Sequence, residues 1–380
     1  MTTALTHARV LAPQGWRDDV AVLVEDGRIR ALVPELDIPA GAATHDLTGQ
    51  TVLPGFIDCQ VNGGGGVLFN DQPTVDGIRA IGTAHRKFGT TGFLPTLISD
   101  TIDKMRTAIA AADAAIAAHV PGVLGIHIEG PFISHAKRGV HDPRFLHTPD
   151  AGELRVAESL TGGVTLLTVA PECVPPDAIR NLVASGVLVA AGHSNADYPT
   201  ARAALDAGVR GFTHLYNAMS PLTSRAPGMV GAALDDANTW CGVIADGHHV
   251  DPASLRVALK AKPRGKVILV TDAMPPVGAA DPSFVLNGET ITARDGICQT
   301  ATGTLAGSAL NMIDAVRNAV GLLGVPLDEA ARMAATYPAE FLGIAATHGR
   351  IAPGQQASFT VVDSGLRVTE TWVDGVVQAV

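Results

Sequence analysis

The sequence predicts an α/β fold, a (β/α)8 TIM barrel with a small β-sandwich domain formed from both chain termini. Eight short runs of β-branched and apolar residues follow one another and end in polar or glycine-containing turns. Alanine-rich segments of helical period separate most of these runs, and strands that alternate with helices are typical of a parallel barrel. Both ends of the chain instead carry strand-like runs with turn signals, which favours a separate β domain.

The predicted strands of the barrel occupy the middle of the chain. They are Thr51–Asp58, Gly92–Leu97, Val123–Pro131, Val164–Glu172, Val187–Ser194, Gly211–Ala218, Trp240–Gly247 and Val267–Ala273. The predicted helices between them include Thr101–Ala118, Asp177–Ala184, Thr200–Ala207 and Asp251–Lys260. In such a barrel the strand interiors fill a packed core, and polar residues at the carboxyl ends of the strands line the active site.

The flanking segments predict the smaller domain. Strand-like runs lie at Ala21–Glu25, Arg28–Val33 and Ser358–Val380. Asp26-Gly27 and Asp374-Gly375 are typical hairpin turns. The two terminal segments are expected to pair into one sandwich.

Domain limits follow from these patterns. Residues 1–50 and 346–380 are assigned to the β-sandwich, and residues 51–345 to the barrel. The hairpin-like stretch Phe284–Gly296 follows the eighth strand and is a candidate third part of the sandwich.

Length and composition set limits on the function. A chain of 380 residues is long enough for a large barrel and one accessory domain. It has no apolar stretch long enough for a membrane span, and its first residues lack the pattern of a secretory signal. The four cysteines lie far apart without a C-x-x-C pair, which fits reduced thiols. We therefore expect a cytoplasmic protein with no membrane partner.

The charge of the chain argues against nucleic acid as a partner. The formal net charge is −10, and the basic residues form no run that could track a phosphate backbone. An anionic small-molecule substrate would need a local cationic pocket.

Histidines and acids lie where predicted strands end. The residues are Glu129, His193, His214 and Asp272. A lone strand histidine is more often structural, whereas a buried carboxylate is costly unless it is paired or bound to a metal. One carboxylate and two imidazoles at the same face form a good ligand set for zinc or a similar divalent ion. Their joint occurrence therefore favours a metal site.

A metal beside a further carboxylate permits hydrolysis. The ion lowers the pKa of its water towards ~7. A nearby Asp272 can take that proton and deliver it to a leaving amine. The residues alone indicate a hydrolase of an amide or ester and name no substrate.

Several strings carry a resemblance to a known family. Pro54-Gly-Phe-Ile-Asp58 resembles the opening of the amidohydrolase superfamily, and longer strings resemble its N-acetylglucosamine-6-phosphate deacetylases. Those strings are Gly125-Ile-His-Ile-Glu-Gly-Pro131, Lys137-Arg-Gly-Val-His141, Ala191-Gly-His-Ser-Asn195, His214-Leu-Tyr-Asn-Ala-Met219, Ile244-Ala-Asp-Gly-His-His-Val250, Leu269-Val-Thr-Asp272 and Gly303-Thr-Leu-Ala-Gly-Ser308. The similarity covers nearly the whole chain.

The resemblance implies a role for each site residue. Glu129, His193 and His214 would be the metal ligands, Asp272 the catalytic acid and base, and His141 a catalytic group against the acetamide carbonyl. The implied substrate-binding residues are Val140, His141, Asn217, Ala218, Arg225, His249, Leu305, Ala306 and Gly307. Arg225 suits a phosphate because a planar guanidinium can donate two parallel hydrogen bonds to it.

One departure from the superfamily concerns the number of metals. Many members carry His-x-His after the first strand for a second ion, whereas this chain has Gln60-Val61-Asn62. An amide is a poor zinc ligand beside imidazole. We therefore predict one divalent metal per subunit, Zn2+ in preference to others.

The resemblance implies metal-dependent hydrolysis of N-acetyl-D-glucosamine 6-phosphate to D-glucosamine 6-phosphate and acetate in amino-sugar catabolism. It also implies a homodimer in which Arg225 or His249 reaches a neighbour's site. Alternatives are a deacetylase for N-acetylgalactosamine 6-phosphate, a cyclic-amide hydrolase, and an inactive barrel used for binding. No predicted strand ends in the lysine that cyclic-amide hydrolases often use, and an inactive scaffold has no physical need for four costly polar groups at one rim.

Overall fold

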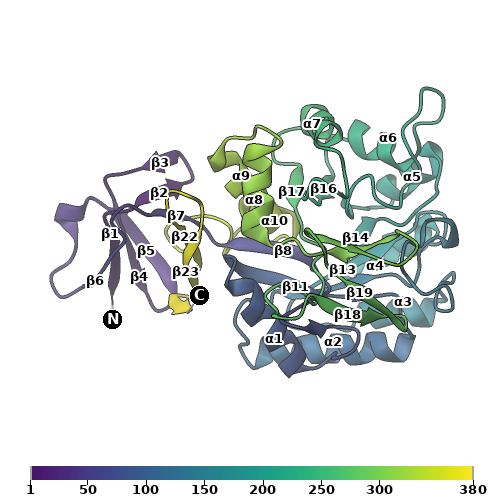
Figure 1. Ribbon diagram of the computed structural model, residues 1–380, viewed down its shortest axis with the longest axis horizontal. Helices are drawn as coiled ribbons and strands as arrows, with labels where there is room; N and C mark the ends of the chain where they lie inside the picture. Colours follow the sequence, from purple (N-terminus) through teal and green to yellow (C-terminus); the bar gives the residue numbers. More distant parts are fainter. Residues whose placement is uncertain (1, 379–380) are drawn as a thin grey trace.

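The computed structural model describes residues 2–378 and shows a barrel joined to a small β domain (Figure 1). Both ends of this described range lie in the small domain, the purple and yellow parts of the ribbon. Residues 1, 379 and 380 fall within the predicted domain limits but lie outside the described residues. Within residues 2–378, none of the helices is long and apolar enough to cross a membrane.

Eight parallel strands form the barrel, and each neighbour in the sheet is also the next strand of the barrel along the chain. The strands are β8 (Phe56–Val61), β11 (Thr90–Ile98), β12 (Gly125–Glu129), β13 (Val164–Val169), β14 (Leu188–Ala191), β15 (Gly211–Phe212), β16 (Trp240–Val243) and β17 (Val267–Leu269). Each falls within or overlaps a predicted strand, so the predicted barrel is confirmed. The later strands are shorter than predicted because the chain leaves the sheet just before the polar residues.

The barrel closes between its first and last strands. The backbone N–H of Asp272 donates to Gln60 O at 3.0 Å, and that of Asn62 donates to Ala273 O at 2.9 Å. Because these bonds join the carboxyl ends of β8 and β17, they fix Gln60 and Asn62 next to Asp272.

Helices surround the sheet (Figure 1). They are α1 (Val75–Arg86), α2 (Ile102–Ala117), α3 (Ala151–Ala157), α4 (Pro176–Ala184), α5 (Tyr198–Asp206), α6 (Gly228–Asp235), α7 (Pro252–Ala261), α8 (Met312–Gly321), α9 (Leu327–Ala334) and α10 (Thr336–Phe341), with 3-10 turns η1 (Glu35–Asp37) and η2 (His135–Lys137). Four of them, α2, α4, α5 and α7, match the predicted helices. Side-chain caps set the starts of three of these, α2, α5 and α7, since Thr101, Asp197 and Asp251 accept hydrogen bonds from backbone N–H groups of the first turns.

Strands from both ends of the chain build the small domain. One sheet has the order β5-β4-β1-β6 and the other β24-β23-β22-β7-β2-β3. Their bounds are β1 (Thr3–Thr6), β2 (Arg9–Ala12), β3 (Gly15–Arg17), β4 (Ala21–Glu25), β5 (Arg28–Val33), β6 (Ala43–Asp46), β7 (Thr51–Pro54), β22 (Phe359–Val362), β23 (Val368–Val373) and β24 (Val376–Gln378). Leu5, Val22, Phe359 and Trp372 share one buried cluster between them.

The predicted strand Thr51–Asp58 is two strands. Its first half, β7, pairs with β2 and β22 in the small domain, and its second half, β8, begins the barrel. They divide at Gly55, where a Cβ atom would lie 2.2 Å from Oγ1 of Thr91. A glycine is therefore required where the chain passes between the domains.

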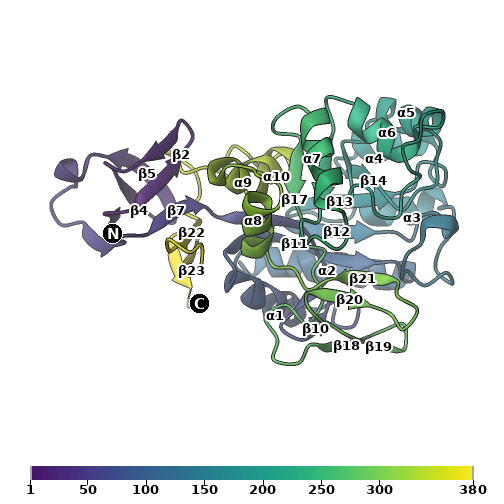
Figure 2. The ribbon, with the colours of Figure 1, turned by 45° about the horizontal axis from the view of Figure 1, so that its top comes forward.

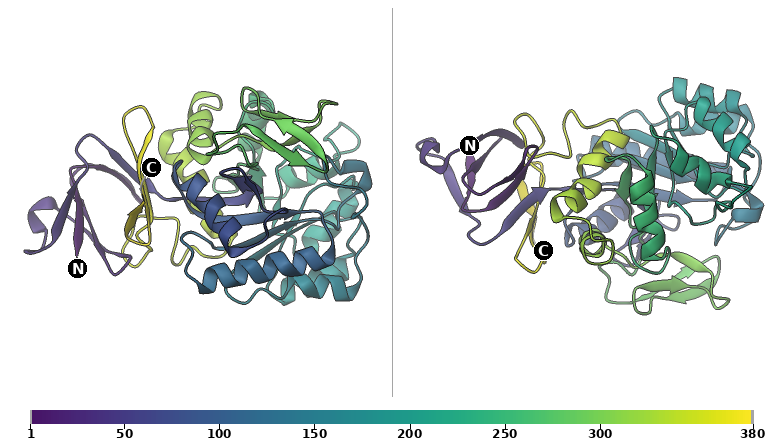
Figure 3. Two further views of the ribbon diagram at one scale, coloured as in Figure 1. Left: turned by 60° about the horizontal axis from the view of Figure 1, so that its bottom comes forward. Right: turned by 90° about the horizontal axis from the view of Figure 1, so that it is seen from above.

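The predicted place of Phe284–Gly296 in the sandwich is wrong. Strands β18 (Ser283–Leu286) and β19 (Glu289–Thr292) form a separate two-stranded sheet, followed by the pair β20 (Ile297–Gln299) and β21 (Leu305–Ser308). Figures 2 and 3 show these hairpins against the barrel, away from the small domain. Their apolar side chains Phe284, Leu286 and Ile291 bury against Met274 and other residues of the barrel mouth, and burial of apolar surface decides the docking.

A further short pair, β9 (Gly63–Gly64) with β10 (Val67–Leu68), also lies at this mouth. The tip of the β18–β19 hairpin contacts the loop after β12, because Asn287 Nδ2 donates to Val140 O at 2.8 Å. The hairpins β18–β19 and β20–β21 therefore form a hood, residues 283–308, over the carboxyl ends of the barrel strands.

Candidate active site

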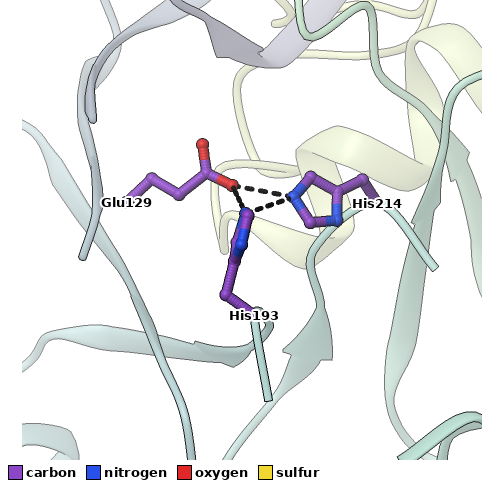
Figure 4. A group of neighbouring side chains, drawn as sticks. All are labelled: Glu129, His193 and His214. Carbon is purple, nitrogen blue, oxygen red and sulfur yellow. Dashed lines mark hydrogen bonds and ion pairs between the residues drawn. The ribbon is translucent and has the colours of Figure 1, made fainter. Parts of the chain in front are cut away.

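Three buried side chains from three strand ends meet at the barrel mouth (Figure 4). Glu129 ends β12, His193 follows β14, and His214 follows β15. Oε1 of Glu129 lies 3.2 Å from Nε2 of His193 and 2.9 Å from Nε2 of His214, and the two Nε2 atoms are 2.9 Å apart. The structure thus brings together the three residues predicted to bind the metal.

Unusual backbone angles turn several of these side chains into the site. His193, His214 and Asp272 have φ values of 47°, 32° and 53°. Positive φ is uncommon for residues with a Cβ and tends to persist at functional sites, where surrounding bonds hold it. Here each residue lies two or three positions after the end of a barrel strand.

The donor set fits a cation. Nδ1 of His193 donates to the carbonyl oxygen of Lys137 at 2.8 Å, which leaves Nε2 as the ring nitrogen that could bind a metal. Nε2 of His193 lies 3.2 Å from Oε1 of Glu129 and 2.9 Å from Nε2 of His214, so one cation could be bound by all three atoms. Burial opposes ionisation of Glu129, but the two imidazoles beside it lower its pKa well below its ordinary value. One carboxylate and two imidazoles suit a divalent metal.

Two amide side chains hold the carboxylates of the site. Gln60 Nε2 donates to Oε1 and Oε2 of Glu129, at 3.2 Å and 3.1 Å, and to Oδ1 of Asp272 at 3.1 Å. Asn62 Nδ2 donates to the same Asp272 oxygen at 2.6 Å. Burial, helped by the charge of Glu129, raises the pKa of Asp272 to about 6. A carboxylate that titrates near neutrality suits both acceptance and return of a proton.

His141 is held as a neutral hydrogen-bond donor. The backbone N–H of Ser99 donates to Nδ1 of His141 at 3.3 Å, and the Ser99 hydroxyl lies 2.7 Å from the same atom. Since Nδ1 accepts, the ring proton is on Nε2. Burial, with a further contribution from His193, lowers the pKa of His141 to about 3, so the ring stays neutral.

These groups share one pocket with a volume of about 360 Å³. The predicted substrate-binding residues that line it are Val140, His141, Asn217, Ala218, His249, Leu305 and Gly307. Leu286 and Thr304 of the hood also contribute to its wall. The pocket is therefore large enough for a small molecule, and two carboxylates, four imidazoles and two amides are among the groups that line it.

His249 has a partner that the sequence did not reveal. Its Nδ1 lies 2.6 Å from Oδ2 of Asp246, so the ring donates to this carboxylate, which fixes the orientation of the ring. Oδ1 of Asp246 accepts from the backbone N–H groups of His248 and His249. An acid three residues before a histidine was the available signal.

Two predicted binding residues lie elsewhere. Arg225 is exposed on the loop between β15 and α6 and does not line the pocket of this chain. The side chain of Ala306 is fully buried in the apolar cluster beneath the hood. Their predicted contacts with a substrate stay predictions.

Lys137 supplies a cation that was not predicted. Among the lysines and arginines of residues 2–378 it alone lines this pocket, and none of the ion pairs in that part of the chain includes it. Its position in the string Lys137-Arg-Gly-Val-His141 was visible in the sequence, but nothing there indicated which of the two adjacent cations faces inward.

The sequence resembles known proteins along its length. Residues 51–378 match the model of the amidohydrolase family. The chain is 45% identical to an N-acetylgalactosamine-6-phosphate deacetylase of Shewanella sp. (strain ANA-3), with 97% of this chain and 94% of that protein covered. It is 36% identical to an N-acetylglucosamine-6-phosphate deacetylase of Haemophilus influenzae, with 94% of each chain covered.

Solved structures agree with these relatives. A crystal structure of N-acetylglucosamine-6-phosphate deacetylase from Pasteurella multocida matches with a TM-score of 0.96 and 36% identity over 100% of both chains. A mutant of the Mycobacterium smegmatis enzyme, solved in complex with N-acetyl-D-glucosamine-6-phosphate, matches with a TM-score of 0.91 and 32% identity over 100% of this chain and 99% of that chain.

Proposed function

The chain belongs to the amidohydrolase family, and we propose that it removes the acetyl group of N-acetyl-D-glucosamine 6-phosphate. The products are acetate and D-glucosamine 6-phosphate, in amino-sugar catabolism. The observation that carries the proposal is the arrangement of Glu129, His193 and His214 beside a carboxylate with a raised pKa, Asp272, in one pocket.

The three clustered side chains are the residues that would hold a metal. A divalent ion, which we propose is zinc at one per subunit, would polarise the acetamide carbonyl and make a water acidic enough to ionise near neutral pH. Gln60 and Asn62 stand at the positions of the His-x-His ligands for a second ion, and their amide groups already donate to Glu129 and Asp272.

Asp272 and His141 then have distinct tasks. Asp272 accepts a proton from the water that attacks the acetamide carbonyl carbon. His141 Nε2–H donates to the carbonyl oxygen as negative charge develops on it. Asp272 returns the proton to the nitrogen as the C–N bond breaks, so acetate and the free amine leave.

Polar groups at the rim would hold the sugar phosphate. Asn217 and Nε2 of His249 suit sugar hydroxyls, and Lys137 suits the phosphate. Arg225 is exposed on its own chain, so we place its phosphate contact in the pocket of a neighbouring subunit of a homodimer. Four free thiols fit a cytoplasmic location.

The galactosamine epimer is a second candidate substrate. Its support is the 45% identity with the Shewanella N-acetylgalactosamine-6-phosphate deacetylase. The two sugars differ only at the 4-hydroxyl, so the metal, Asp272 and His141 would act on both in the same way.

Acetate release tests the proposal. N-acetylglucosamine 6-phosphate, N-acetylgalactosamine 6-phosphate and unphosphorylated N-acetylglucosamine are compared with chelated and zinc-restored protein. We expect metal-dependent turnover that is fastest with the first substrate, and turnover several orders of magnitude slower from Asp272→Asn, which should still bind substrate. Faster turnover of the second substrate would transfer the assignment to the epimer. No acetate from any substrate would contradict the proposed reaction.

A further inference from the structure

Asn62 has one polar atom that the fold leaves without a partner. The side chain is 1% exposed, and its Oδ1 makes no hydrogen bond within the described part of the chain. Asn62 is nevertheless part of the pocket wall. A buried acceptor that is not satisfied costs on the order of 1–3 kcal/mol, so this atom is expected to meet a donor from whatever enters the pocket.

The orientation of the amide is fixed by its other end. Nδ2 of Asn62 donates to Oδ1 of Asp272 at 2.6 Å. If the amide were turned over, two acceptor oxygens would face each other at this distance, so the carboxylate determines which atom is Oδ1. The carbonyl oxygen of Asn62 is therefore the atom left for a ligand.

The backbone makes this arrangement rigid. The N–H of Asn62 donates to Ala273 O at 2.9 Å, its carbonyl oxygen accepts from Phe69 N at 2.8 Å, and Asp272 N donates to Gln60 O at 3.0 Å. These bonds hold Asn62 and Asp272 next to each other where the first and last barrel strands meet. A donor that approaches Asp272 also approaches Oδ1 of Asn62.

We propose that Oδ1 of Asn62 accepts a hydrogen bond from the N–H of the substrate acetamide, and so holds the leaving nitrogen beside Asp272. The inference rests on the proposed function. The scissile nitrogen must come close to Asp272 to receive its proton, and in the bound amide this nitrogen carries one N–H that needs an acceptor. Asn62 accepts from the acetamide N–H through Oδ1 while its Nδ2 still donates to Asp272. One side chain therefore aligns Asp272 with the nitrogen that receives the proton.

A structure tests the contact without altering Asn62. The Asp272→Asn variant keeps an oxygen that can accept from Nδ2 of Asn62, and when it is loaded with metal and soaked with N-acetylglucosamine 6-phosphate it should retain the uncleaved amide. We expect Oδ1 of Asn62 at hydrogen-bond distance from the acetamide nitrogen. If Oδ1 instead bonds a water or a sugar hydroxyl and lies beyond contact with the nitrogen, the inference is wrong, whether or not the enzyme is a deacetylase.

Kinetics separate a direct contact from support of Asp272. The analogue with an acetate ester at carbon 2 has no N–H, so it cannot make the bond. We expect Asn62→Leu, of similar shape, to lower kcat/KM for the amide by roughly tenfold more than for the ester, the effect of one lost hydrogen bond. Gln60→Met is the matched control, because Gln60 also donates to Asp272 but is absent from the pocket wall among the described residues.

The outcomes are distinct. The ratio of kcat/KM for the amide to kcat/KM for the ester is compared in the two variants. If Asn62→Leu and Gln60→Met change this ratio equally, Asn62 acts only through Asp272, and the inference is overturned. The inference would also be overturned if the wild-type enzyme is active and Asn62→Leu has the same kcat/KM for the amide. If the wild-type enzyme releases no acetate, the proposed function fails first, and this is seen before either variant is assayed.

Discussion

Ser99 donates its backbone N–H to Nδ1 of His141 at 3.3 Å, so the imidazole proton is on Nε2. The two residues come from different strand ends, Ser99 just after β11 and His141 from the loop after β12. Because the donor is a backbone group, no substitution at position 99 other than proline removes it. The tautomer of His141 is therefore a property of the fold.

This relationship predicts a difference between two variants. His141→Ala removes the donor to the developing oxyanion, and we expect kcat to fall roughly 10²- to 10³-fold. Ser99→Ala leaves the backbone N–H in place, so a much smaller loss is expected. The measurement is kcat for acetate release by the zinc-restored proteins. Equal losses in both variants would show that the Ser99 hydroxyl, not the backbone, sets the tautomer.

The amides of Gln60 and Asn62 predict the metal content. Each donates N–H groups to Glu129 or Asp272, so neither offers a lone pair at those contacts. We expect elemental analysis of the zinc-restored protein to give one ion per chain. The double substitution Gln60→His with Asn62→His restores His-x-His and should raise the content towards two ions. Two ions in the unaltered protein would contradict the prediction.

Lys137 predicts a contribution to phosphate binding from within the chain. Lys137→Met keeps the length of the side chain but removes the charge, and we expect KM for the phosphorylated substrate to rise by roughly tenfold. KM for unphosphorylated N-acetylglucosamine should stay the same. The matched control is Arg138→Met, since Arg138 is exposed and lies outside the pocket wall in residues 2–378. A similar rise for both variants would point to the overall charge instead.

The barrel and its site were predictable because both depend on local patterns. Apolar runs of strand length recur at the spacing of strand and helix, and Glu129, His193, His214 and Asp272 each follow such a run. In a parallel barrel the carboxyl ends share one face, so residues distant in sequence converge without further information.

What the sequence could not reveal depends on contacts between distant segments. Nothing local separates β7 from β8, because Gly55 is required only by its approach to Thr91. The hood hairpin has the strand pattern of the terminal domain, and its docking on the barrel mouth is decided by tertiary apolar contacts. The orienting partner of His141, Ser99, lies 42 residues away. Within residues 2–378, Arg225 is exposed and does not line the pocket that holds Asp272, so the sequence of one chain cannot place it.

Asp58 predicts how stability depends on pH. This fully buried carboxyl joins the first and last barrel strands by accepting from the Thr271 hydroxyl at 2.5 Å and from the backbone N–H of Gln60 at 3.2 Å. Burial raises its pKa from 3.8 to about 7. Because the folded state then holds a proton that the unfolded state has lost, its stabilising contribution is complete below pH 3.8 and declines until the pH passes about 7.

The test compares the wild-type protein with Asp58→Asn, whose amide can still accept from the backbone and donate to the Thr271 hydroxyl. Between pH 4 and pH 7 we expect the free energy of unfolding of the wild type to fall relative to the variant by up to ~1.4 kcal/mol per pH unit. Urea unfolding of the two proteins in parallel buffers measures this difference and cancels the titration of every other group. A difference independent of pH over this range would mean that Asp58 is ionised throughout, and that its three hydrogen bonds outweigh its burial.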